Sequence, residues 1–106
     1  MLSKSNRLSR EEFSKYFKTG KRTHSPVATL ITASSEVFHG AVVVSKKVNK
    51  KAVKRNTLRR RAYSQLYNAF KIKNKGVYIL ILKPPFNNLT RKQQHQEIKD
   101  LIEEVE

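Results

Sequence analysis

The sequence contains no cysteine and no tryptophan, and only three glycines and three prolines among its 106 residues. Without cysteine the chain has no disulfide framework, no thiolate ligand for zinc and no thiol nucleophile. Its longest apolar run, residues 77–82, is far shorter than the ~20 residues that a membrane-spanning helix needs. No apolar stretch follows the basic N-terminal residues, so we expect no secretory signal, no membrane partner and a cytoplasmic protein.

Acidic residues are also scarce, and they are unevenly placed. The chain has 23 Lys and Arg against 8 Asp and Glu, a formal net charge of +15. No acid occurs between Glu36 and Glu97, whereas nine basic residues lie between Lys46 and Arg61. Such a charge favours a polyanionic partner and salt-sensitive association. The alternative is a solvated lysine-rich surface, but surfaces of that kind normally mix both signs of charge.

Periodicity and turn residues predict one α+β domain over residues 1–106, with no repeat and no linker. Ser9 and Glu12 have the spacing of a capping box and predict a short helix that starts at Arg10. Strands are predicted over 27–33, 37–45 and 77–82, a long helix over about 49–70, and a last helix after Thr90. The expected order is therefore helix, two or three strands, helix, strand, helix, with one sheet.

The expected long helix carries two kinds of side chain on one face. Its apolar stripe consists of Leu58, Ala62, Leu66, Ala69 and Phe70. Arg55 and Arg59 lie on the same stripe, and a helix cannot bury unpaired arginines against an apolar sheet. We therefore expect the first two turns to extend beyond the core and expose basic residues, while the later turns pack on it. The last helix has its own stripe, formed by Ile98, Leu101, Ile102 and Val105.

The start of the long helix breaks a local electrostatic rule. Lys50, Lys51, Lys54 and Arg55 crowd the positive end of the helix dipole, where each cation costs about 0.3–1 kcal/mol at low salt. Phosphate oxygens would offset this cost, and arginine binds phosphate bidentately. The segment therefore predicts a phosphate-binding surface. For Asn56, spacing alone leaves two readings open, a contact to RNA and an ordinary exposed helix residue.

Phe13 and Phe17 share one face of the first helix at i, i+4 spacing. Periodicity alone favours two core residues. The alternative is a stacking surface for single-stranded nucleotides.

Groups that could cut a phosphodiester bond are not gathered in this sequence. Protein nucleases commonly use carboxylates on metal ions or a pair of histidines. None of the eight acids lies near the basic segment, and His24, His39 and His95 are scattered without metal-ligand spacing. We therefore expect no catalytic residue and no metal ligand in this chain.

Residues 45–60 (SKKVNKKAVKRNTLRR) resemble the signature of the ribonuclease P protein family. That signature runs Ser-Lys-Lys, a short variable loop, then Arg-Asn-Arg-x-Lys-Arg on a helix. Arg7 and Leu8 before an aromatic helix that ends at Gly20 are similar to the family N-terminus, and residues 77–84 (VYILILKP) are similar to its last strand. The similarity spans most of the chain.

Two positions depart from the family pattern in charge. Thr57 and Tyr63 stand where the family has arginine, whereas Arg59 replaces a lysine and keeps its charge. Arg61 and Lys54 lie close enough in sequence to compensate for Thr57. Tyr63 could replace an ionic contact by stacking.

The resemblance implies a two-layer α/β sandwich with about four strands and a left-handed β-α-β crossover, against the usual preference. It implies a protein subunit that binds a catalytic RNA and the 5′ leader of precursor tRNA, with one protein per RNA. The RNA would cut the leader, and Mg²⁺ would enter through the RNA. RNA contacts would come from Lys46, Lys47, Lys50, Lys51, Lys54, Arg55, Asn56, Arg59 and Arg60. A leader-binding cleft would be lined by Phe13, Phe17 and Ile31.

Two other classes of binding protein share features with this sequence. Charge and size fit a non-catalytic ribosomal RNA-binding protein equally well, and only the Ser-Lys-Lys and Arg-Asn pattern separates the two. A sequence-specific DNA reader fits poorly, because the arginine-rich helix is followed by a strand and not by a second helix.

Overall fold

The structure, a computed structural model, describes residues 8–73 and 75–104, and only the backbone over residues 69–73. The elements in chain order are α1 (Arg10–Thr19), β1 (Lys21–His24), β2 (Ala28–Ala33), β3 (Phe38–Val43), α2 (Ala52–Lys73), β4 (Gly76–Leu82), the 3-10 helix η2 (Pro84–Asn88) and α3 (Arg91–Glu104). The predicted α+β order is confirmed, with three strands before the long helix. The sequence did not predict β1 or η2.

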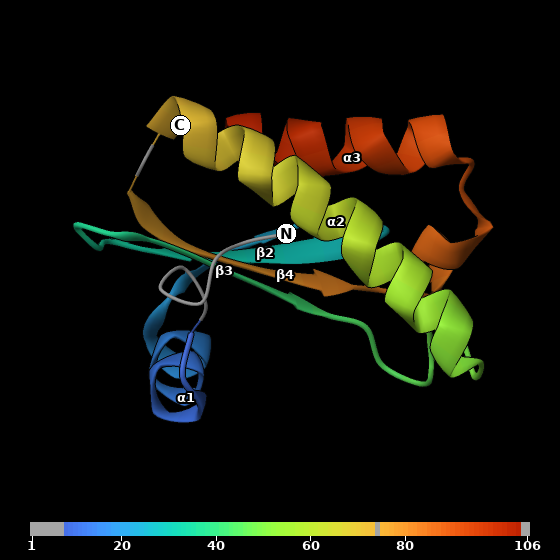
Figure 1. Cartoon of the computed structure of the whole chain (residues 1–106), viewed down its shortest axis with the longest axis horizontal. Coiled ribbons are helices and arrows are strands. Elements are labelled where there is room, and N and C mark those ends of the chain that lie inside the picture. Colours follow the sequence, from blue (N-terminus) through green and yellow to red (C-terminus); the bar gives the residue numbers. More distant parts are fainter. Residues whose placement is uncertain (1–7, 74, 105–106) are drawn as a thin grey trace.

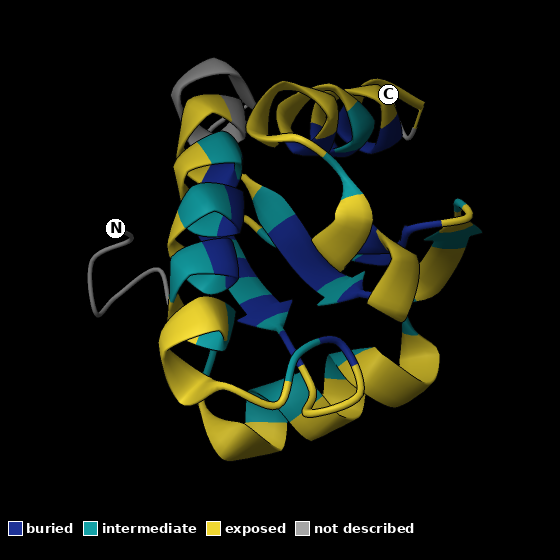
Figure 2. Cartoon of the chain, turned by 90° about the vertical axis from the view of Figure 1, so that its right-hand side faces the viewer, coloured by how far each residue is buried: buried dark blue, intermediate teal, exposed yellow. Residues whose placement is uncertain are grey.

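The four strands form one sheet in the order β1-β2-β4-β3. β2 runs antiparallel to β1 and β4, and β3 runs parallel to β4, with Val42 opposite Leu80. A parallel pair needs a crossover connection, and α2 supplies it. Figures 1 and 2 together show that the passage from β3 over α2 to β4 is left-handed, the rare sense that the resemblance implied.

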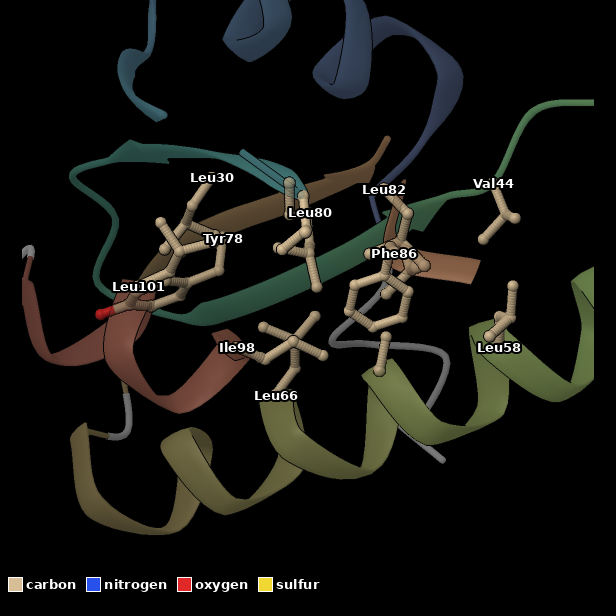
Figure 3. Close-up of a cluster of buried hydrophobic side chains, with 14 of the residues drawn as sticks. Leu30, Val44, Leu58, Leu66, Tyr78, Leu80, Leu82, Phe86, Ile98 and Leu101 are labelled. Carbon is tan, nitrogen blue, oxygen red and sulfur yellow. The ribbon is translucent and has the colours of Figure 1, made fainter. Parts of the chain in front are cut away.

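The main core lies between the sheet and the pair α2 and α3, which cover the same face (Figure 1). In Figure 3, side chains from both helices and from the sheet point toward one another around Leu80 and Phe86. Of the two predicted helix stripes, the buried members are Leu58, Ala62, Leu66, Ile98, Leu101 and Ile102. The remaining members, Ala69, Phe70 and Val105, lie outside the side chains that the structure describes. Phe86 of η2, fully buried at 0% exposure, completes this core.

The opposite face of the sheet is covered in part by α1 (Figure 1). Ile31, Val77 and Ile79 are fully buried there, and Phe13 and Tyr16 of α1 pack against them. The predicted two-layer sandwich thus gains a partial third layer. Cover on both faces explains why β4 is a continuous apolar run.

The beginning of α2 extends beyond the core, as its sequence predicted. Val53 is 75% exposed, and Lys54 and Asn56 are exposed as well. Leu58, at 5% exposure, is the first α2 residue buried in the core. Figure 2 shows this change from exposed to buried along the helix. About the first turn and a half therefore presents its side chains to solvent.

Candidate nucleic-acid interface

The basic loop between β3 and α2 is fixed to the body of the protein at two points. Val48 is buried in the core at 5% exposure. Asn49 donates from Nδ2 to Asn87 Oδ1 of η2 over 3.1 Å, and its own Oδ1 accepts from the Lys51 N–H at 2.9 Å. The lysines of this loop therefore project from an ordered backbone.

Arg55 has a structural role in this loop. Its Nη1 donates to the backbone oxygens of Asn49 at 3.0 Å and Lys50 at 2.9 Å, and the side chain is half-buried. These bonds join the first turn of α2 to the loop that precedes it. The sequence predicted a direct RNA contact here, but the bonds to the loop use at least one of the five guanidinium N–H groups.

Arg59 and Asn56 form a pair on the next turn. Arg59 donates from Nη1 to Asn56 Oδ1 over 2.7 Å, which leaves the Asn56 amide N–H groups and the rest of the guanidinium available to a ligand. Arg60 beside them is exposed. Thr57, in contrast, turns its hydroxyl back onto the Val53 carbonyl at 3.0 Å and adds nothing to this surface.

Together these residues form the basic ridge, defined as Lys46, Lys47, Lys50, Lys51, Lys54, Arg55, Asn56, Arg59 and Arg60. Arg55 and Arg59 are half-buried and the other seven are exposed. The first turn of α2 contains no acid, and within the described part of the chain no carboxylate bonds to the ridge. The structure thus brings together every residue that the sequence assigned to RNA contact.

Tyr63, which stands at a family arginine position, lies beside the edge of the sheet. Its hydroxyl oxygen accepts from the Val42 N–H of β3 at 3.4 Å, and its ring packs against the main core. Because β3 is an edge strand, this bond satisfies a backbone donor that would otherwise face solvent. The expected stacking role thus competes with a structural one.

The aromatic pair on α1 is stacked but not free. The Phe13 and Phe17 ring centroids lie 5.7 Å apart with 26° between the ring planes. The Arg22 guanidinium carbon lies 4.7 Å from the Phe17 centroid, and its Nη2 donates to the Phe17 carbonyl at 2.8 Å. Phe17, 37% exposed, is therefore in contact with both neighbours, and the guanidinium of Arg22 ends the stack. We call these three residues the aromatic stack.

Ile31 does not reach the surface beside the aromatic stack. It is 0% exposed and lies beneath the end of α1. The approach there is so close that a Cβ on Gly20 would clash with Ile31 Cγ2 and come within 2.7 Å of the Tyr16 carbonyl oxygen. Ile31 can therefore support a cleft from below but offers no contact area of its own.

Two polar residues on this face were not predicted from the sequence. Arg22 lies opposite Ile31 in the pairing of β1 with β2, and His39 lies opposite Val77. The His39 Nδ1 atom is buried without a hydrogen-bond partner among the described residues. The alternation of side chains along a strand at Lys21–His24 would have placed Arg22 on this face. However, a four-residue polar segment gives no reason to expect a strand.

Glu12 near this face has a shifted pKa. The Ser9 backbone N–H donates to its carboxylate at 3.0 Å, and this bond, followed by the Ser9 side chain, holds the pKa of Glu12 below its usual value. The charges of His39 and Lys15 act in the same direction more weakly. The carboxylate serves to cap α1.

Neither a metal site nor a membrane-spanning element is found in the described part of the chain. Over residues 8–73 and 75–104, no three His, Cys, Asp or Glu side chains gather where they could hold a metal ion. Within the same ranges no helix is both long enough and apolar enough to span a membrane.

Comparison with known proteins identifies the family. The family model for ribonuclease P matches residues 2–106. No curated protein matches the sequence. Among solved structures, the ribonuclease P protein of Staphylococcus aureus is similar with a TM-score of 0.84 at 21% identity, covering 97% of each chain. The ribonuclease P protein of Thermotoga maritima is similar with a TM-score of 0.82 at 18% identity, covering 94% of this chain and 97% of its own.

At these identities the solved structures show only that the fold is shared. The family model matches nearly the whole sequence and shows the family. The chain therefore belongs to the ribonuclease P protein family, has a part in the ribonuclease P holoenzyme with its RNA, and acts in tRNA 5′ processing.

Proposed function

We propose that the chain binds the ribonuclease P RNA through the basic ridge and holds the 5′ leader of precursor tRNA near the aromatic stack. The observation that carries this proposal is the ridge itself, which has seven exposed members and no described carboxylate bonded to it. A surface of this kind is stabilised by phosphate and not by the protein's own acids.

Cleavage of the leader is assigned to the RNA and not to this chain. No three of the described acids and histidines gather where they could hold a metal ion, and none of them bonds to the ridge, which supports this assignment. Mg²⁺ would be held through the RNA, and one protein would serve one RNA in the cytoplasm.

The aromatic stack is suited to single-stranded RNA. Arg22 ends the stack with a guanidinium plane, on which a base can stack and which can also bind a phosphate. The stack lies on the face of the sheet that α1 covers, whereas the ridge lies beyond the end of the sheet where α2 begins, so one can contact the leader while the other contacts the catalytic RNA (Figure 1).

Reconstitution tests the proposed function. Precursor tRNA is mixed with a bacterial ribonuclease P RNA at low magnesium, with and without the protein, and 5′ cleavage is measured. We expect the protein to stimulate cleavage by the RNA and to leave the substrate intact when the RNA is omitted. Cleavage by the protein alone would place the chemistry in this chain, and absence of stimulation would contradict the subunit role.

Phe17→Ala tests the leader contact. We expect a loss of roughly 5-fold or more in affinity for precursor tRNA, because the Phe17 ring holds the Arg22 guanidinium on which a base would stack, and base stacking contributes about 1–3 kcal/mol. Mature tRNA, which has no leader, should bind the complex that contains the variant as tightly as it binds the complex that contains the original protein. Val37→Ala, which shortens another exposed apolar side chain, is the control. An equal loss for both RNAs would rule out a leader-specific contact.

A further inference from the structure

A second group of basic side chains lies on the other side of α2, where α2 meets α3. A cavity of about 90 Å³ opens there, which is room for several water molecules. Its described polar lining consists of Arg61, Ser64, Gln65, Arg91, Gln94 and His95, with no acid among them. We call it the α2–α3 notch.

The notch is built on a buried amide. Gln94 is only 3% exposed, and its Nε2 donates to the carbonyls of Phe86 at 3.2 Å and Leu89 at 3.3 Å. These two bonds fix the amide so that Oε1 accepts from Arg61 Nη1 at 3.2 Å. The guanidinium of Arg61 is therefore held in place by a neutral group, and among the described residues no carboxylate bonds to it.

The remaining polar side chains of the notch make few hydrogen bonds to the described part of the protein. Gln65 Nε2 lies 2.8 Å from His95 Nδ1, and when the amide donates to Nδ1 the ring N–H of His95 lies on Nε2. Arg91 is exposed and bonds to no described residue. Two arginines, a histidine and a serine thus line one small cavity. This donor set fits an oxyanion with several acceptor oxygens, and arginine pairs with phosphate most strongly.

We propose that the α2–α3 notch binds one phosphate group of the RNA backbone, as a second RNA contact separate from the basic ridge. The proposal rests on the proposed RNA-binding function and adds a second point of attachment to it.

The position of the notch on α2 favours a polymeric ligand. Tyr63, one turn after Arg59, bonds to β3, whereas Arg61 and Gln65 bond to α3. The notch therefore opens on the side of α2 away from β3. A helix with its side chains is about 10–12 Å across, so a single phosphate cannot reach both sides. An RNA strand that passes α2 can contact the cations of the ridge on one side and those of the notch on the other. A free anion would explain only the notch.

Arg91→Gln is the main test, because Arg91 is exposed and bonds to no described residue. Affinity for a ribonuclease P RNA is measured against salt concentration. We expect binding to weaken roughly 3- to 10-fold, and the slope of log K against log salt to fall by about 0.7–0.9, the value of one phosphate contact. Lys92→Gln removes the same charge from the next residue, outside the notch, and should leave the slope nearly unchanged. Equal effects from both variants would overturn the proposal.

Inorganic phosphate is the second probe, since it separates an RNA phosphate from a free one. Titration is followed by NMR of the Arg61 and Arg91 side-chain N–H groups and of the His95 ring. We expect these signals to shift with added phosphate and to stop shifting when the RNA is bound. Shifts that persist unchanged in the RNA complex would mean a free-anion site and would overturn the RNA contact. Absence of shifts together with an unchanged Arg91→Gln slope would overturn the site itself.

The proposed function fails in a different way. If the original protein bound the RNA without salt dependence, or if ridge substitutions did not change the affinity, the assignment of the basic ridge to RNA binding would be wrong. That conclusion would hold for either result at the notch. If ridge substitutions weaken binding and Arg91→Gln does not, only the notch is wrong.

Discussion

Arg55 and Arg59 lie one turn apart on α2 and carry the same charge, but their hydrogen bonds differ. Arg55 bonds to two backbone carbonyls of the loop before the helix, whereas Arg59 bonds to the exposed side chain of Asn56. Removal of the Arg55 side chain leaves two loop carbonyls without their donor. Removal of the Arg59 side chain leaves only the solvated amide of Asn56. The two substitutions should therefore separate a positioning residue from a contact residue.

Arg59→Ala should weaken binding to the ribonuclease P RNA roughly 3- to 10-fold, because a charge-assisted contact to phosphate is lost. The free energy of unfolding should change by less than about 1 kcal/mol, since most of the neighbouring surface is exposed. Arg55→Ala should instead cost about 1–2 kcal/mol and raise amide hydrogen exchange at Lys50 and Lys51. A protein that unfolds on Arg59→Ala would show that Arg59 is structural.

At the scale of single residues, the sequence predicted which side chains are charged and which helix face they share. It could not predict the partner atoms. The bonds of Arg55 depend on a loop whose path is set by buried Val48 and by the pairing of Asn49 with η2. Likewise, the complete burial of Ile31 follows from the close approach of α1 at Gly20, which no local pattern indicates.

At the scale of elements, α1 packs on the sheet through half-buried side chains only, so its cap contributes a large share of its stability. Ser9 and Glu12 are bonded reciprocally, at 3.0 Å from the Ser9 N–H to the carboxylate and at 3.2 Å from the Glu12 N–H to the hydroxyl. The pKa of Glu12 is lowered in the folded protein, so its charged form is favoured by folding. That stabilisation is present above the ordinary value of 4.5 and is lost as pH falls through the lowered pKa.

We therefore expect α1 to fray at acid pH before the rest of the protein unfolds. Amide hydrogen exchange of α1 between about pH 6 and pH 3 measures this effect, with β4 as the internal reference. Glu12→Gln keeps a bond acceptor but has no charge to titrate, so α1 should lose most of this pH dependence. Glu11→Gln, on the same turn but outside the cap, is the matched control and should retain it. Equal pH profiles for the two variants would contradict the role of Glu12.

Elements with strong local signals were predicted from the sequence, and those defined by tertiary contacts were not. The capping box of α1 and the apolar run of β4 are local, and both are confirmed. β1 has four polar residues and exists because it pairs with the edge of β2. The 3-10 helix η2 follows from two prolines and is fixed by Phe86, whose burial depends on how α2 and α3 cover the sheet.

At the scale of the whole molecule, charge is separated along the chain. The basic ridge lies on the loop before α2 and on its first turns, and the notch uses the start of α3, while the described acids of the last third of the chain, Glu97, Asp100, Glu103 and Glu104, all lie later on α3. Such a separation orients the protein in the field of a polyanion before contact is made. The acidic part of α3 should therefore face away from the RNA.

This arrangement predicts a steep dependence of RNA binding on salt. If six or more phosphates are contacted, affinity for the ribonuclease P RNA should fall on the order of 10³-fold or more between 50 and 200 mM salt. Each exposed ridge lysine changed to glutamine, for example Lys50 or Lys54, should lower the slope by about 0.7–0.9. Glu103→Gln changes a charge on α3 and should leave the slope unaltered, because counterions are released only where phosphates are contacted. A flat salt response would mean that the excess of positive charge serves solubility and not RNA binding. If Glu103→Gln changed the slope as much as a ridge lysine substitution does, net charge, and not the ridge, would determine affinity.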